Sequence, residues 1–248
     1  MNYTGNTILI TGGGSGIGRA LAEASHAAGN QIIIAGRRQA VLDETVAANP
    51  GMRSVVLDIA DAEDIRTVAA RLTADFPALN VVIHNAGIMQ TEEIQSGNLD
   101  SAEATVATNL LGPIRLTAAL LPHLLAQPTA AIMTVSSGLA FVPMALTPTY
   151  SATKAAIHSY TESLRHQLRG TAVEVFELVP PYVQTELMGA HQANDPHAMP
   201  LQEFIDETMS LLGQLPNGGE VLVERVKPLR LAEATGKYEF MYGQINRE

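Results

Sequence analysis

Short runs rich in isoleucine, valine and leucine recur along the chain, each followed by a longer segment of mixed polarity. Several of the runs are apolar at consecutive positions rather than at alternate ones. This pattern is typical of strands that are covered on both faces. The runs predict strands over residues 7–10, 32–34, 54–57, 81–84, 130–135, 173–178 and 221–223.

The segments between the runs have the period of amphipathic helices. Residues Ile17, Leu21, Ala24 and Ala28, for example, share one helical face. Strands that alternate with helices predict an α/β fold, in which a doubly wound, mainly parallel sheet has helices on both faces. No repeat or linker divides the chain, so we expect one domain over residues 1–248. The predicted helices are 17–28, 38–48, 62–75, 101–126, 150–169 and 201–215.

Composition excludes several kinds of site. The 248 residues include no cysteine, which rules out disulfides, zinc–thiolate sites and cysteine nucleophiles. A net charge of −10, from 15 Lys and Arg against 25 Asp and Glu, is unsuited to general nucleic-acid binding. The chain has no run of about 18 apolar residues and no basic, apolar leader, so we expect no membrane span and a cytoplasmic location. We expect no metal site.

A glycine-rich segment follows the first predicted strand and opens the first predicted helix. Glycines let the backbone approach a pyrophosphate closely, and the helix N-terminus adds N–H donors and partial positive charge. A flexible turn is the alternative, but the strand–turn–helix context favours a dinucleotide site of the Rossmann type. The segment comprises Thr11, Gly12, Gly13, Gly14, Ser15, Gly16, Ile17 and Gly18.

The end of the second predicted strand indicates which dinucleotide binds. An acidic residue at this place accepts the ribose 2′-hydroxyl of NAD, whereas Arg37 and Arg38 stand here. Arginine binds a phosphate through paired N–H groups, so we expect NADP(H), with Arg37 as the main contact and NAD(H) as the second choice. The alternative is that both arginines are solvated charges at a helix start.

Tyr150 and Lys154 are four residues apart, on one face of a predicted helix. Lys154 is one of three lysines, and a nearby ammonium lowers the pKa of a tyrosine. Ser137 ends the fifth predicted strand, at the sheet edge where α/β proteins bind ligands. Its hydroxyl suits a carbonyl or alkoxide oxygen. Together with the glycine-rich segment, these residues predict a catalytic site.

These motifs resemble the classical short-chain dehydrogenases/reductases over nearly the whole chain. Residues 11–18 resemble that family's TGxxxGxG, and Ser137 with Tyr150 and Lys154 resembles its Ser…YxxxK. Asn85-Ala86-Gly87 is similar to its NAG motif, and 180–185 to its PGxVxT. The resemblance implies the strand order 3-2-1-4-5-6-7 and a homodimer or homotetramer built on the long helices.

The resemblance also implies roles for individual residues. Tyr150 would be the general acid/base, and Ser137 would orient the substrate oxygen. Lys154 would lower the pKa of Tyr150 and bind the nicotinamide ribose, and Asn109 would hold a water of the proton relay. The remaining cofactor contacts would be Asp58 and Ile59 at the adenine, Asn85, Ala86 and Gly87 at the ribose, and Pro180, Val183 and Thr185 at the nicotinamide.

Two positions depart from the family pattern. His84 stands where the family often has Asn, and we expect it to be a packed core residue. Pro181 stands where the family often has Gly, which stiffens the chain beside the nicotinamide. We expect a variable lid over about 186–215 and a largely apolar pocket for a neutral substrate. Its candidate lining, some of which could be plain core, is Ile88, Met89, Leu139, Phe141, Met144, Tyr182, Leu187 and Met188.

The sequence therefore predicts an NADP(H)-dependent oxidoreductase that interconverts a small-molecule carbonyl and alcohol by hydride transfer. Two alternatives remain at this point. One is a catalytically silent module that senses a dinucleotide, and the other is a nicotinamide-dependent epimerase or dehydratase.

Overall fold

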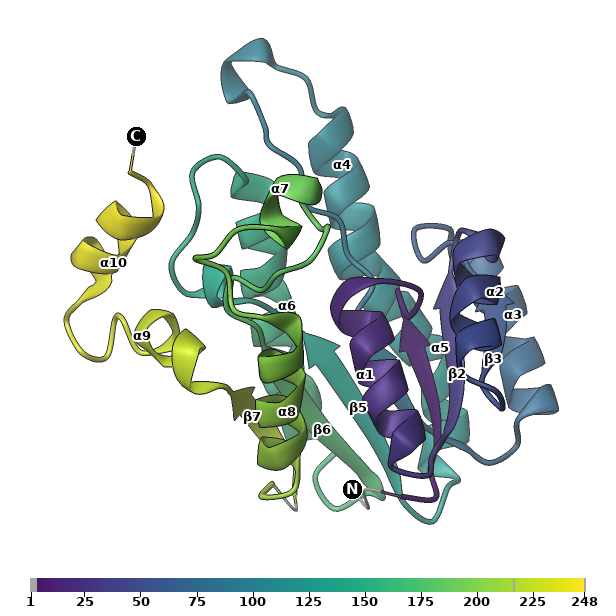
Figure 1. Ribbon diagram of the computed structural model, residues 1–248. Helices are drawn as coiled ribbons and strands as arrows, with labels where there is room; N and C mark the ends of the chain where they lie inside the picture. Colours follow the sequence, from purple (N-terminus) through teal and green to yellow (C-terminus); the bar gives the residue numbers. More distant parts are fainter. Residues whose placement is uncertain (1–3, 216, 248) are drawn as a thin grey trace.

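Seven strands lie side by side in the computed structural model, which describes residues 4–215 and 217–247 (Figure 1). Every pairing is parallel, and the order across the sheet is β3-β2-β1-β4-β5-β6-β7. The predicted α/β fold and strand order are confirmed. The strands are β1 (Thr7–Thr11), β2 (Gln31–Gly36), β3 (Arg53–Val56), β4 (Leu79–His84), β5 (Ala130–Val135), β6 (Val173–Val179) and β7 (Gly219–Leu222).

Helices follow the strands where the amphipathic segments predicted them, and the chain ends in two further helices that the pattern did not predict. One of the predicted helices is divided in two, and short 3-10 turns lie at Ile94–Ser96, Gly138–Ala140 and Glu224–Val226. The helices are α1 (Gly16–Ala27), α2 (Gln39–Ala48), α3 (Ala62–Asp75), α4 (Asp100–Val106), α5 (Gly112–Leu125), α6 (Pro148–Gln167), α7 (Ala190–Ala193), α8 (Leu201–Leu212), α9 (Lys227–Arg230) and α10 (Tyr238–Ile245).

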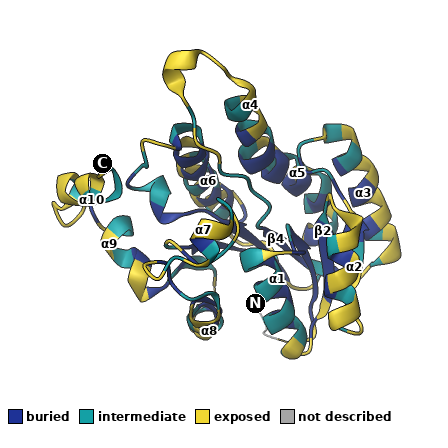
Figure 2. Ribbon diagram, turned by 45° about the horizontal axis from the view of Figure 1, so that its top comes forward, coloured by how far each residue is buried: buried dark blue, intermediate teal, exposed yellow. Residues whose placement is uncertain are grey.

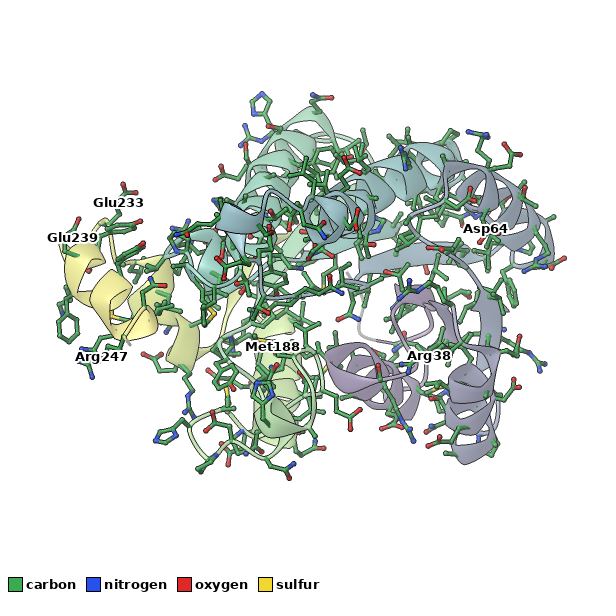
Figure 3. All side chains as sticks on the ribbon, turned by 90° about the horizontal axis from the view of Figure 1, so that it is seen from above. Arg38, Asp64, Met188, Glu233, Glu239 and Arg247 are labelled. Carbon is green, nitrogen blue, oxygen red and sulfur yellow. The ribbon has the colours of Figure 1, made fainter. Side chains whose placement is uncertain are left out.

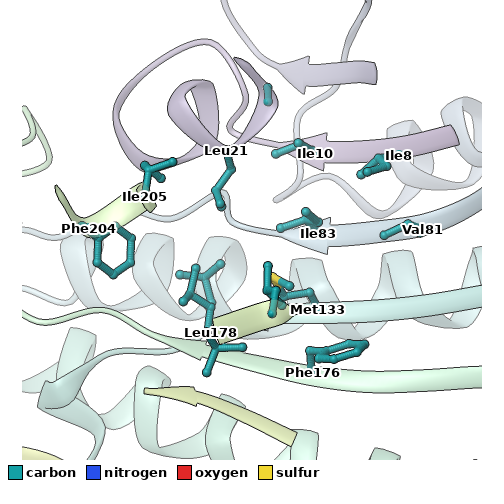
Figure 4. Packing of buried hydrophobic residues seen from close by; sticks show 14 of the residues in the cluster. Ile8, Ile10, Leu21, Val81, Ile83, Met133, Phe176, Leu178, Phe204 and Ile205 are labelled. Atoms are coloured by element: carbon teal, nitrogen blue, oxygen red, sulfur yellow. The ribbon is translucent and has the colours of Figure 1, made fainter. Parts of the chain in front are cut away.

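The sheet is buried on both faces because its strands send alternate side chains to opposite sides. Ile8 and Ile10 of β1 belong to a core cluster with residues of α1 and α8, whereas Leu9 belongs to a second cluster with residues of α3, α5 and α6. Figure 4 shows the first cluster, in which Phe204 and Ile205 of α8 pack near Leu21 of α1. The second half of the predicted lid is therefore α8, whose inner face is part of the core.

The predicted helix over 101–126 differs from the structure at its middle. A π-helical turn, Ala107–Leu111, separates α4 from α5. The stretch Asp100–Leu125 is long and apolar enough to cross a membrane, by length and composition alone. In the fold, Leu116 and Leu120 of this stretch are fully buried in the cluster shared with α3, as expected for a core helix.

Two outlying parts of the molecule are largely exposed, in addition to the outer faces of α2 and α3 (Figure 2). One is the segment that leads into α4, where Ile94 and Leu99 are exposed. The other is the C-terminal α10, which lies beyond β7 and beside α9 (Figure 1). Asn246 ties this end back to the body, because its amide donates to the carbonyl of Pro143 and accepts from the N–H of Ala145.

Candidate functional site

The glycine-rich turn joins β1 to α1 and brings the backbone close to the end of β4. Gly12 has φ +67°, a conformation that favours glycine. A Cβ on Gly18 would lie 2.3 Å from the Asn85 side-chain nitrogen and from the Gly12 carbonyl oxygen. Ser15 precedes α1, and within the described residues its side chain makes no capping hydrogen bond to that helix. The turn is therefore a cradle that suits a bound phosphate.

Thr11 and Asn85 hold this turn in place. The Thr11 hydroxyl accepts from the N–H groups of Asn85 and Ala86, both at 3.1 Å. The Asn85 amide donates to the Thr11 carbonyl at 3.0 Å. Thr11 and Asn85 thus hold the turn that joins β1 to α1 against the end of β4. The Thr11 hydroxyl is used in hydrogen bonds to the backbone of this protein.

A cavity of about 160 Å³ lies beside the turn, where β2 and β3 end. Arg37 and Arg38 are exposed and line it together with Asp58 and Ile59. Asp58 is held from both sides, since its N–H donates to Asp64 and its carboxylate accepts from the N–H of Ala60. The arginine pair and Asp58 therefore face one pocket.

A larger cavity, of about 640 Å³, shares the arginine pair and part of the glycine turn with the first. Figure 3 labels Arg38 from the arginine pair and Met188 from the lid. Most of the predicted site residues meet in this cavity, whereas Thr11, Gly14, Asp58 and Ile59 line the smaller one alone. The residues that it brings together include Gly12, Ser15, Gly16, Ile17, Asn85, Ala86, Gly87, Ser137, Tyr150, Lys154, Pro180, Val183 and Thr185.

Tyr150 and Lys154 lie one turn apart on α6 and are almost completely buried. Burial raises the pKa of Tyr150 to about 12, and a hydrogen bond with the Ser137 side chain acts in the opposite direction. Burial also lowers the pKa of Lys154 to about 8, opposed by the charge of Glu177. The Lys154 ammonium donates to the carbonyl of Val135 at 2.7 Å and lies 5.5 Å from the Tyr150 ring centre.

Ser137 is the second residue after β5 and lines the larger cavity. Its hydroxyl accepts from the N–H of Leu139 at 3.1 Å and so begins the 3-10 turn Gly138–Ala140. Gly138 is packed tightly, since a Cβ there would lie 2.6 Å from the side chain of Leu229. The C-terminal segment thus supports the loop that presents Ser137.

Asn109 lies in the π-helical turn and serves the loop after β4. Its side-chain oxygen accepts from the N–H of Ile88 at 2.9 Å, and its amide donates to the Ile88 carbonyl at 2.9 Å. It also donates to Thr153 of α6 at 3.4 Å. Asn109 is not among the residues that line the two cavities, so its amide positions this loop against α6.

Gln192 of α7 is a site residue that the sequence gave no reason to select. Its amide donates to the carbonyl of Val183 at 2.8 Å and to the hydroxyl of Thr185 at 3.1 Å. Its oxygen accepts from the N–H of Met188. A single buried glutamine therefore fastens the lid segment to the residues predicted to meet the nicotinamide.

The predicted substrate pocket is only partly as expected. Ile88, Met89 and Leu187 line the larger cavity, alongside the polar Gln90 and Glu186. The other five candidates, which are Leu139, Phe141, Met144, Tyr182 and Met188, are not among its lining residues.

His84 is a packed core residue, as the sequence predicted. Its Nε2 lies 2.9 Å from the Thr117 hydroxyl, and burial lowers its pKa to about 4. His84 therefore stays neutral at physiological pH.

Comparisons with known proteins agree with this geometry. A sequence model of the short chain dehydrogenase family matches residues 6–196. An uncharacterized oxidoreductase of Bacillus subtilis, DltE, is 38% identical over 255 positions, covering 100% of this chain and 99% of that protein. A short chain dehydrogenase from Burkholderia cenocepacia in complex with NADP has a TM-score of 0.82 at 23% identity, with 99% of each chain covered. One from Burkholderia phymatum in complex with NAD has a TM-score of 0.81 at 23% identity, covering 100% of this chain and 98% of that one.

Proposed function

The chain belongs to the short chain dehydrogenase family, and from this premise we propose that it is an NADP(H)-dependent oxidoreductase that interconverts a carbonyl and an alcohol. One observation carries the proposal. Ser137, Tyr150 and Lys154 line the same cavity as the glycine turn and the arginine pair. Groups suited to proton transfer thus lie where a dinucleotide held by the turn would present its reactive end.

The residues present fit a dinucleotide along the whole groove. The cradle at Gly12 and Gly18 has no room for a Cβ, which leaves backbone available for a pyrophosphate. Arg37 and Arg38 would hold a 2′-phosphate, while Val183 and Thr185 would hold the nicotinamide end. We propose NADP(H) as the preferred cofactor and NAD(H) as the second, in line with the cofactors held by the two Burkholderia proteins.

The cofactor, when bound, supplies or accepts the hydride. The chain supplies the proton and the orientation. Tyr150 is protonated at neutral pH because burial holds its pKa near 12, so it is ready to donate a proton to a carbonyl oxygen. Ser137 would hold that oxygen by donating its hydroxyl hydrogen to it, in place of the hydrogen bond that the hydroxyl makes with Tyr150.

Lys154 has two roles in this proposal. Its ammonium lies 5.5 Å from the centre of the Tyr150 ring, and its positive charge would favour the phenolate form of Tyr150 when the reaction runs toward the ketone. One of its three N–H donors is committed to the Val135 carbonyl, which leaves two for the ribose hydroxyls.

The remaining features are proposed on the same basis. We propose a neutral, largely apolar small molecule as the substrate, because Lys154 is assigned to the cofactor and the lining segments 88–90 and 180–187 carry no lysine or arginine. We also propose a cytoplasmic homodimer or homotetramer. Size-exclusion chromatography with light scattering tests the assembly.

A panel of carbonyls and alcohols, followed at 340 nm with NADPH, NADH and their oxidised forms, tests the proposed function. Tyr150→Phe removes a single hydroxyl, and we expect it to lower kcat by about 100-fold or more while NADPH binding is retained. Tyr160→Phe, the same change at a half-buried tyrosine of the same helix, is the control. NADPH binding without turnover by the wild type would favour the silent sensing module, and product formation without net NADPH consumption would favour an epimerase or dehydratase.

A further inference from the structure

Glu177 is a buried carboxylate directly behind the site, and the chemistry above makes no use of it. It lies in β6 between Thr134 of β5 and Glu220 of β7, and none of its surface is exposed. A buried carboxylate is costly unless charged or hydrogen-bonding groups compensate it. The groups that face Glu177 therefore indicate what it does.

Two side chains bind the Glu177 carboxylate. The Ser136 hydroxyl donates to one oxygen at 2.6 Å. The His158 Nδ1 lies 3.0 Å from that oxygen and 2.9 Å from the other. The hydrogen bond to Glu177 is the main cause that raises the pKa of His158, which is expected for a charge-assisted hydrogen bond.

Both partners adjoin residues of the proposed chemistry. Ser136 directly precedes Ser137 at the end of β5. His158 follows Lys154 by four residues, and therefore lies one turn further along the same face of α6. One carboxylate thus joins the strand end that carries Ser137 to the helix that carries Lys154.

Three more charged side chains surround the Glu177–His158 pair. Glu220 lies 3.7 Å from the His158 ring, and Arg230 binds the Glu220 carboxylate at 2.9 to 3.1 Å. Glu162 lies 3.9 Å from the other ring nitrogen of His158. His158, Glu177 and Glu220 are close enough to hold a cation. Arg230 already binds the Glu220 carboxylate, and protonation of His158 would balance the charge of Glu177.

We propose that Glu177 is a positioning residue, which sets the Ser137 hydroxyl and the Lys154 ammonium in place through Ser136 and His158. Its charge also keeps Lys154 protonated, since it opposes the effect of burial on the pKa of that ammonium. The inference rests on the proposed function, because Ser137 and Lys154 matter only if they serve that reaction.

Two substitutions distinguish the effect of the Glu177 charge from the effect of its side-chain length. Glu177→Gln keeps the length of the side chain and removes its charge, whereas Glu177→Asp keeps the charge and shortens the side chain. Glu174→Gln, the same change three residues earlier in β6, is the matched control. Melting temperatures establish that each variant is folded.

We expect Glu177→Gln to lower kcat by about tenfold, to leave the KM for NADPH within about twofold, and to shift the alkaline limb of the kcat profile down by about half a pH unit or more. We expect Glu177→Asp to lower kcat and to keep the alkaline limb. A general loss of folding would instead lower the melting temperature and raise the KM for NADPH together. If Glu177→Gln does not fold, His158→Gln replaces it, with an expected kcat loss of about threefold to tenfold.

A direct titration of Lys154 makes the test independent of turnover. The chain has three lysines, so protein labelled with ¹³C at the lysine ε-carbon gives three signals, and the Lys154 signal is assigned from Lys154→Met. We expect its pKa to be lower in Glu177→Gln than in wild type and Glu174→Gln by about half a unit or more. An unchanged pKa together with an unchanged kcat overturns the inference. Absence of turnover in the wild type contradicts the proposed function instead, and the titration then decides the inference alone.

Discussion

Arg37 and Arg38 offer the sharpest test of cofactor choice. Both are exposed and line the smaller cavity at the end of β2, and Asp58 is the acidic side chain among the described residues that line it. NADPH differs from NADH by one phosphate, with a charge of about −2 at neutral pH. Removing the Arg37 side chain should therefore weaken the binding of NADPH and leave the binding of NADH almost unaffected.

The size of this effect follows from the exposure of the arginines. Two unit charges 4 Å apart attract by about 1 kcal/mol in water and by about 4 kcal/mol near a protein surface. Because both side chains are exposed, and Arg38 remains, the lower part of this range applies to Arg37→Ala. We expect kcat/KM for NADPH to fall by about 10- to 100-fold, with further loss in the double variant.

The assay is the ratio of kcat/KM for NADPH to that for NADH, measured at 340 nm at two salt concentrations. Added salt should lower the NADPH value more steeply, because it screens the phosphate contact. Arg53→Ala removes the same charge from an exposed position at the start of β3, away from the cavity, and serves as the control. Equal losses for both cofactors in Arg37→Ala, or a wild type that prefers NADH, would refute the assignment.

Two further predictions concern the scaffold. Gly18→Ala should abolish NADPH binding and lower the melting temperature, since its Cβ would lie 2.3 Å from atoms of Asn85 and Gly12. Gly243→Ala is the control, because a Cβ there meets nothing within 4 Å, and it should bind NADPH normally in the same titration. The depressed pKa of His84 means that the folded protein binds fewer protons than the unfolded chain, so stability should fall by about 3 kcal/mol as the pH drops from about 6.5 through 4. Urea unfolding from pH 7 to 4 should show a shallower loss in His84→Asn than in wild type, while the exposed control His166→Asn follows wild type; parallel curves for all three would contradict this account.

Local patterns predicted the sheet well because each strand is covered on both faces. Continuous or nearly continuous apolar runs, such as 32–34 and 130–135, are what such burial requires, and the structure has strands at both places. The spacing of Tyr150 and Lys154 likewise predicted a shared helical face, since residues four apart in a helix are neighbours. Both kinds of feature depend on residues close together in the chain.

Other features depend on partners far apart in the sequence, and local reasoning missed them. The bond between Ser136 and Glu177 joins residues 41 positions apart, and Asn109 reaches Ile88 across 21. The π-helical turn at Asn109 interrupts a segment whose amphipathic pattern predicts a single helix. One signal was nevertheless available, because Glu177 is a charged residue in a strand expected to be buried on both faces.

The support behind Ser137 comes from beyond the part of the chain that the family model matches. That match ends at residue 196, whereas Leu229 packs against Gly138 and Arg230 stacks 4.5 Å from the centre of the Phe141 ring. The proposed catalytic groups and part of the wall that supports them therefore lie in different segments of the chain. A substitution at Leu229 would alter the packing behind residues 137–140 without changing any residue of the matched segment, so the position of the Ser137 hydroxyl can be adjusted from a distant part of the chain.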